Sequence, residues 1–142
     1  MNKLGDLSCN EFLTELASAA PAPGGGGGAA MAGALAAALA SMVANLTIGK
    51  EKFADREPEV KELLEQAEAE RVRLLTLVDE DAAVFNSFMS CYKLPKTTDE
   101  EKAARTAAIR AAAKQAATVP LNIARSSFAV LKLADRLVVA GN

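Results

Sequence analysis

The chain has 142 residues, the size of one domain, with 16 Lys and Arg against 18 Asp and Glu and no histidine. A net charge of -2 provides no bulk electrostatic attraction to nucleic acid or to an anionic membrane. Hydrophobic residues make up 51% and aromatic residues only 4%, so a core must be built from Ala, Leu, Val and Met, which favours helices over a β-sheet.

The two cysteines, Cys9 and Cys91, fit neither a disulfide framework nor a zinc site, because they are far apart and have no histidine partner. We interpret them as free thiols in a reducing cytoplasm and expect no metal site. The uncharged segment from Ala22 to Ile48 is long enough to span a bilayer, but its Ala and Gly content disfavours insertion. We therefore expect a soluble, cytoplasmic protein.

A short first helix is predicted after Ser8, which forms a capping-box pattern with Glu11. Pro21 and Pro23 end this segment, and five consecutive glycines, 24–28, follow them. Consecutive glycines before a helix expose N–H groups at its positive end, so this turn is a candidate anion site. Composition alone favours the other interpretation, a tight turn with close helix packing.

A second helix is predicted from near Gly28 to about Ile48. Its large apolar residues recur at steps of four, three and four, which predicts a packing stripe: Leu35, Leu39, Met42 and Leu46. A second stripe of small residues permits close backbone approach: Ala29, Gly33, Ala37 and Ser41. A helix this apolar on all sides must be central in a bundle or lie at a subunit interface.

A long third helix is predicted from Pro58, a favoured first-turn residue, to about Tyr92. One of its faces carries a stripe with steps of four and three: Val60, Leu64, Ala67, Arg71, Leu74, Val78, Asp81, Phe85, Phe88 and Tyr92. The Arg71 side chain is long enough to reach water from this stripe.

Thr98 and Glu101 form a second capping box, which predicts a fourth helix. Pro120 either kinks that helix or begins a fifth, whose inward residues would be Ala124, Phe128, Leu131 and Val138. The prediction is a single all-α domain over residues 1–142, a bundle of long antiparallel helices.

Asp81 is the most informative charged residue, because it occupies a stripe position among apolar neighbours. Without histidine, acid–base chemistry falls to carboxylates, Lys, Tyr or Cys. A buried carboxylate must be paired, hydrogen-bonded or protonated. Two interpretations stay open: an internal salt bridge, for instance to Arg105 or Lys50, or a general base or counter-charge for a cationic substrate. Lys50 also suits the negative end of the second helix.

Several blocks in order along the chain resemble the cyclodeaminase/cyclohydrolase family of folate enzymes. The blocks are Pro21-Ala22-Pro23-Gly24-Gly25-Gly26, Gly33 to Leu39, Met42-Val43, Leu46 to Lys50, Asp81 with Ala83 and Phe85, Leu94-Pro95-Lys96, Glu101-Lys102, Arg105, Pro120-Leu121 and Gly141-Asn142. The family usually has serine where this chain has Gly27, and it ordinarily continues beyond Asn142, so its C-terminal segment is missing from these residues.

This resemblance implies an all-helical homodimer that binds a tetrahydrofolate derivative near the subunit interface and needs no other cofactor. It implies conversion of 5-formimidoyltetrahydrofolate to 5,10-methenyltetrahydrofolate with release of ammonia, or hydration of the methenyl compound. Asp81 would be the catalytic carboxylate. Lys50, Lys96 or Arg105 would hold the glutamate tail, and the turn with Gly25 and Gly26 would close against the ligand. The alternative is a non-catalytic helical dimerisation or scaffold protein derived from that family.

Overall fold

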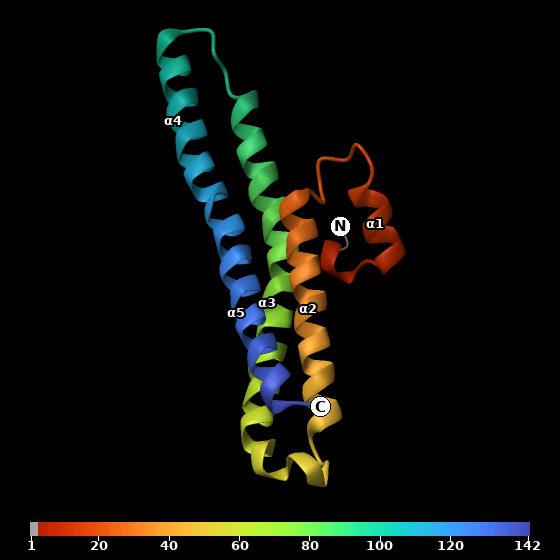
Figure 1. The fold of residues 1–142 in the computed structure, drawn as a ribbon. Helices are drawn as coiled ribbons and strands as arrows, with labels where there is room; N and C mark the ends of the chain where they lie inside the picture. The colour runs from red at the N-terminus through yellow and green to blue at the C-terminus, as the bar shows by residue number, and fades with distance from the viewer. Residues whose placement is uncertain (1–2) are drawn as a thin grey trace.

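The computed structural model describes residues 3–142, which form helices without a strand and so confirm the all-α prediction. Figure 1 shows α2, α3 and α5 side by side, α1 against the upper half of α2, and a hairpin of α3 and α4 that extends beyond α2. The α-helices are α1 (Cys9–Leu16), α2 (Gly25–Thr47), α3 (Glu57–Ser90), α4 (Asp99–Ala116) and α5 (Thr118–Ala140), and the short 3-10 helices are η1 (Leu4–Asp6), η2 (Glu51–Arg56) and η3 (Cys91–Lys93).

The structure confirms the helix starts that were predicted from capping boxes and prolines. Ser8 and Glu11 form a complete capping box at α1, and Thr98 and Glu101 form another at α4. Pro58 lies in the first turn of α3. A break at residue 117 separates α4 from α5, so Pro120 stands in the first turn of a fifth helix, where its missing N–H costs no helical hydrogen bond.

The small residues of α2, and not its large ones, face the core. Its buried residues are Gly27, Ala30, Gly33, Ala34, Ala37, Ala40, Ser41, Ala44 and Thr47. The predicted packing stripe therefore does not pack inside the bundle. Its residues are 50–63% exposed: Leu35, Leu39, Met42 and Leu46. The physical reason is that large side chains from α3 fill the core, and α2 can approach them only through a face of Gly, Ala and Ser.

The predicted inward face of α5 is wrong in the same way. Ala124, Phe128, Leu131 and Val138 are exposed. The residues that α5 buries are Val119, Ile123, Ser126, Val130, Leu133, Leu137 and Ala140. Because α5 has apolar residues on two opposite faces, periodicity alone does not decide which face is inside.

The upper part of α3 leaves the core after Val78, since α2 and α5 do not accompany it. Phe85 is 40% exposed, and α4 has no buried residue. Phe88 of α3 and Tyr92 of η3 form an edge-to-face contact with ring centroids 5.3 Å apart, at the end of the first arm of the hairpin. The stripe predicted for α3 therefore forms core only along its lower half.

One described helix, α2, is long and apolar enough to cross a membrane by length and composition. The same properties are found in core helices of soluble proteins, and α2 buries its small-residue face against α3 and α5. The expectation of a soluble chain stays a prediction.

Replacement of Gly33 by valine should destabilise the fold by about 1–3 kcal/mol, because overpacking forces neighbours to move. A Cβ at Gly33 would lie 2.9 Å from Ser127 Oγ and 3.2 Å from both Leu74 Cδ atoms. Ala32→Val, on the exposed side of the same helix, is the matched control. Urea denaturation measures both variants, and an equal loss would contradict the packing described.

Candidate functional site

Asp81 lies where the first turn of α2 meets α3. Its Oδ2 accepts a hydrogen bond of 2.9 Å from the N–H of Gly27. The first N–H groups of a helix have no intrahelical partner, and its N-terminus favours negative charge. The N-cap residue Gly24 has no side chain to cap them, so Asp81 supplies the cap from α3. The residue as a whole is half-buried.

Glycine at position 26 allows this approach, since a Cβ there would overlap the Asp81 carboxylate. Within residues 3–142 the second oxygen of Asp81, Oδ1, forms no hydrogen bond and is free to accept one from a ligand. Of the two interpretations left open for Asp81, the internal salt bridge to Arg105 or Lys50 is not formed within residues 3–142, where Asp81 accepts a hydrogen bond from a backbone N–H instead. Because a carboxylate already occupies the positive end of α2, a second anion at Gly25 or Gly26 is disfavoured.

Asp79 positions a second segment against α3. Its Oδ1 accepts a hydrogen bond of 2.6 Å from the N–H of Leu4, which fixes η1 beside α3. Asp79 is not among the site residues predicted from the sequence, because no sequence signal marks a contact between residues 75 positions apart. Asp79 and Asp81 thus hold two distant segments on one stretch of α3.

A polar network connects the middle of α2 to α3. The buried Ser41 Oγ donates a hydrogen bond of 2.7 Å to Glu68, which also forms a 2.7 Å ion pair with Arg71. The Arg71 hydrogen bonds, followed by that of Ser41, lower the pKa of Glu68 to about 2. Arg71 therefore does more than reach water from its stripe, because it holds the carboxylate that anchors Ser41.

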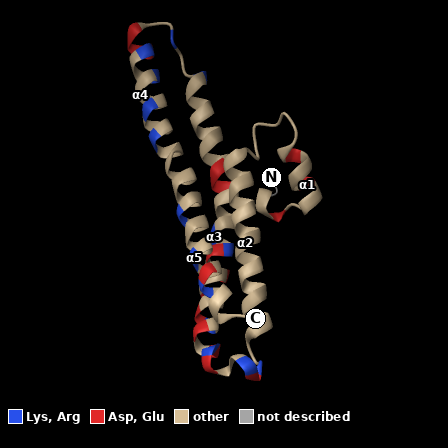
Figure 2. Ribbon diagram, in the orientation of Figure 1, with Lys and Arg blue, Asp and Glu red and all other residues tan. Residues whose placement is uncertain are grey.

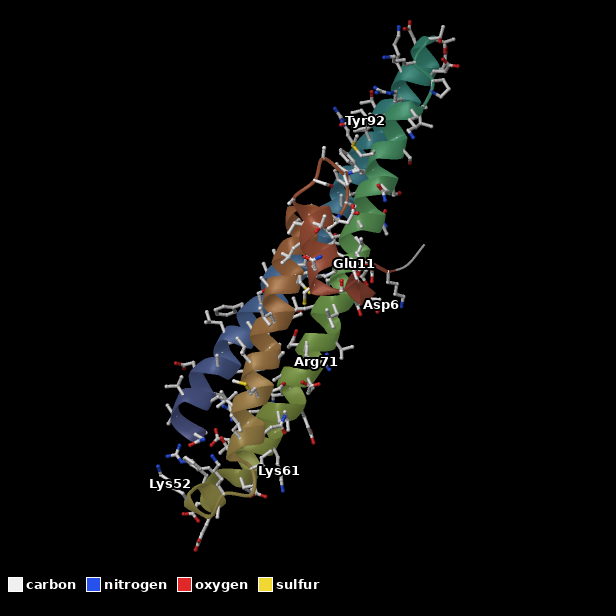
Figure 3. All side chains as sticks on the ribbon, turned by 90° about the vertical axis from the view of Figure 1, so that its right-hand side faces the viewer. Asp6, Glu11, Lys52, Lys61, Arg71 and Tyr92 are labelled. Carbon is white, nitrogen blue, oxygen red and sulfur yellow. The ribbon has the colours of Figure 1, made fainter. Side chains whose placement is uncertain are left out.

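The six residues predicted for substrate and catalysis form three separate groups. Asp81 lies with Gly25 and Gly26, at the N-terminal end of α2. Lys96 and Arg105 lie on the α3–α4 hairpin. Lys50 follows the other end of α2, roughly 35 Å away at 1.5 Å per residue over 23 residues. Figure 3 shows this separation through Lys52 at one end and Tyr92 near the other.

Arg105 is bound within the hairpin. Its Nη2 donates a hydrogen bond of 3.3 Å to the carbonyl of Tyr92, and its guanidinium lies 5.4 Å from the centre of the Tyr92 ring. Its Nε is buried and has no hydrogen-bond partner in the described residues. Lys96 is exposed in the loop before α4. Arg105 thus has a structural contact, which leaves Lys96 as the more available cation of this pair.

Two grooves lie away from Asp81. One, of about 400 Å³ and largely apolar, runs between α2 and α5. The other, of about 380 Å³, runs between α3 and α5 beside Glu70, Lys132 and Arg136. Within residues 3–142 no cluster of three or more His, Cys, Asp or Glu side chains could hold a metal ion.

The family model described as formiminotransferase-cyclodeaminase matches residues 8–142, nearly the whole chain. The chain belongs to this family. The match covers α1 through α5 and therefore includes the junction at which Asp81 caps α2.

Relatives from three organisms agree with this assignment. A methenyltetrahydrofolate cyclohydrolase of Methylorubrum extorquens is 48% identical over 138 residues, which are 97% of this chain and 66% of that protein. A formimidoyltransferase-cyclodeaminase of Sus scrofa is 37% identical over 92% of this chain and 24% of its own. A crystal structure of formiminotetrahydrofolate cyclodeaminase from Thermotoga maritima superposes with a TM-score of 0.84 at 34% identity and covers 99% of this chain and 66% of that chain. The chain thus spans about two thirds of the first relative's length and about a quarter of the second's.

The capping contact predicts different effects for two substitutions of Asp81. Asp81→Ala should lower the free energy of unfolding by about 1 kcal/mol, the usual cost of a lost helix cap. Asp81→Asn keeps an oxygen that accepts from Gly27, so it should cost only a few tenths of a kcal/mol. Thermal and urea denaturation measure both, and equal losses would show that the contact is not a cap.

The Glu68 network predicts a stability change in acid. Because the folded-state pKa of Glu68 is about 2, below its ordinary value of 4.5, this group stabilises the fold above about pH 4.5 and loses the contribution as pH falls toward 2. Glu68→Gln should flatten the acid limb of stability against pH. Glu65→Gln, an exposed neighbour, is the control. Identical profiles for Glu68→Gln and the unmodified protein would contradict the assigned cause.

Proposed function

We propose that this chain is a folate one-carbon enzyme that hydrates 5,10-methenyltetrahydrofolate. The observation that supports the proposal most is the half-buried Asp81 at the α2–α3 junction, in a chain 48% identical to a methenyltetrahydrofolate cyclohydrolase. Because the chain covers only part of its relatives, activity of these residues by themselves is part of the proposal.

The substrate explains why a carboxylate would be useful at this position. The reacting carbon lies between two nitrogens in a delocalised cation, and a fixed negative charge stabilises such a cation in a partly water-free site. Oδ2 accepts a hydrogen bond from Gly27, which leaves Oδ1 as the oxygen for the proposed reaction. Water adds to the carbon and gives one proton to Asp81. The electron pair of one carbon–nitrogen bond then returns to its nitrogen, which takes up that proton, while the hydroxyl group gives its remaining proton to solvent and becomes the formyl carbonyl.

The proposal also includes partners, oligomeric state and location. The glutamate tail of the substrate carries carboxylates, for which Lys96 and Arg105 are the predicted cations on the same hairpin. The proposed protein acts as a homodimer in the cytoplasm and uses no cofactor besides the tetrahydrofolate substrate. The isolated Lys50 of the same chain is too far from Asp81 to join them.

A second activity, ammonia release from 5-formimidoyltetrahydrofolate, is favoured by the structural match to the Thermotoga maritima cyclodeaminase. It involves the same cation, formed in this case as N10 attacks and ammonia leaves. A Lys or Asp near the leaving nitrogen would donate the proton, which is a role the Asp81 carboxyl can take after accepting one.

Absorbance of the methenyl compound separates the candidate functions. Purified protein should accelerate its loss if the chain is a cyclohydrolase, and should produce it from the formimidoyl compound if the chain is a cyclodeaminase. Asp81→Asn should lower kcat by about 10²–10⁴, the range of general acid–base catalysis, while the exposed neighbour Glu80→Gln should keep full turnover. Full turnover in Asp81→Asn would remove Asp81 from the chemistry. If the protein changes the absorbance in neither assay, the enzyme proposal fails and the non-catalytic scaffold is the remaining alternative.

A further inference from the structure

The α3–α5 groove, of about 380 Å³, has walls of opposite polarity. Gln66 and Glu70 line it from α3, and Lys132 and Arg136 line it from α5, the helix whose outer edge carries basic residues in Figure 2. Because Gln66 Nε2 donates a hydrogen bond of 2.9 Å to Glu62, the side-chain oxygen of Gln66 is left as an acceptor. One wall thus offers acceptors and negative charge, and the other offers positive charge.

The charges of the two walls are not paired with each other. Within residues 3–142 Glu70 forms no ion pair, and its Oε2 is buried without a hydrogen-bond partner. In the same residues Lys132 forms no ion pair, and its Nζ lies 5.1 Å from the centre of the Phe128 ring. A carboxylate with a buried, unpartnered oxygen costs free energy, and a cationic donor beside it would compensate that cost.

The α5 wall can hold a carboxylate. Arg136 Nη2 donates a hydrogen bond of 3.0 Å to Glu59 at one end of the groove. A guanidinium has further N–H donors in a planar fork, so this pair leaves others for a ligand. Lys132 precedes Arg136 by four residues on α5, which places both cations on one face of the helix. Together they can bind one carboxylate through charge-assisted hydrogen bonds.

The rest of the groove is apolar and suits a small ligand. Ala69 and Ala129 line it from opposite helices, and their short side chains leave the space between the walls unfilled. The buried Leu133 adds an apolar surface, which favours an aliphatic ligand side chain. The volume is at the lower end of the roughly 300–1,000 Å³ of ligand pockets, so the ligand is small.

We propose that the α3–α5 groove binds a free α-amino acid with an aliphatic side chain. The ammonium group of the ligand lies beside Glu70, its carboxylate contacts Lys132 and Arg136, and its side chain packs on the apolar surface. A simple anion satisfies only the α5 wall and a simple amine only the α3 wall, so the ligand needs both charges. The site is separate from the proposed reacting centre, because Glu70 and Asp81 are about 16 Å apart along α3.

Three matched ligands test whether both charges are needed. L-Leucine carries both groups, isocaproate lacks the ammonium group, and isoamylamine lacks the carboxylate. In an NMR titration of the 142-residue chain, L-leucine should bind with a Kd on the order of 1 mM, a modest affinity that suits so small a ligand. The other two should bind about tenfold more weakly or worse, because each lacks one charge-assisted contact. Glycine should also bind more weakly than L-leucine, because it lacks the aliphatic side chain.

Substitutions in the groove separate the two contacts. Glu70→Gln should weaken L-leucine binding about tenfold without weakening isocaproate binding, whereas Lys132→Gln should weaken both. Ala69→Leu, at an exposed position of α3, fills the groove without changing a charge and should abolish binding. Glu65→Gln, also exposed on α3 but outside the groove, is the matched control and should bind as the unmodified chain does. Far-UV circular dichroism checks that each variant keeps its helices.

Backbone amide shifts show where the ligand binds. They should change around residues 66–70 and 129–136 and not at the α2–α3 junction. No saturable binding of L-leucine at about 10 mM, tenfold above the expected Kd, overturns the proposal, as expected if Lys132 turns to pair with Glu70 and closes the groove. Equal affinity for the three matched ligands, or shifts centred on the α2–α5 groove, overturns it too. Loss of the proposed enzymatic activity would leave all of these results unchanged.

Discussion

Close packing between the small-residue face of α2 and the large side chains of α3 is the contact on which the rest of the structure depends. At Gly33 the two helices approach so closely that a methyl group would press on Leu74 and Ser127. This approach brings the first turn of α2 within hydrogen-bond distance of Asp81, and it places Ser41 against Glu68. It also turns the large residues of α2 outward. The core, the candidate site and the exposed apolar face therefore share one cause.

Asp81 combines two roles that are usually assigned to different residues. One carboxylate oxygen satisfies the N-terminus of α2, and the other is free. A helix cap is normally supplied by the preceding residue, but the glycine turn has no side chain to offer. The fold thus orients a single carboxylate by a backbone hydrogen bond, and this fixed negative charge supports the proposed stabilisation of a substrate cation. The same arrangement explains why the glycine turn itself is a poor anion site.

Local features of the sequence were predicted well because they depend on neighbouring residues. The capping boxes at Ser8 and Thr98, the first-turn Pro58 and the lower stripe of α3 were all confirmed. The inward faces of α2 and α5 were not, because both helices are apolar on two sides and only tertiary packing selects one. The sequence indicated Asp81 as a site residue but not Gly27 as its hydrogen-bond partner. It also did not show that Lys50 lies far from Lys96 and Arg105, because the distance between residues in the fold is not visible in the sequence.

In the proposed function the reacting centre of the substrate lies at the α2–α3 junction and not in the α2–α5 or α3–α5 groove. A crystal structure with bound 5,10-methenyltetrahydrofolate, or a stable tetrahydrofolate analogue, tests this most directly. The account predicts the one-carbon centre within hydrogen-bond reach of Asp81 Oδ1, with Gly26 and Gly27 beside it. A ligand bound instead in the α3–α5 groove near Glu70 and Lys132, with Asp81 uncontacted, would contradict it.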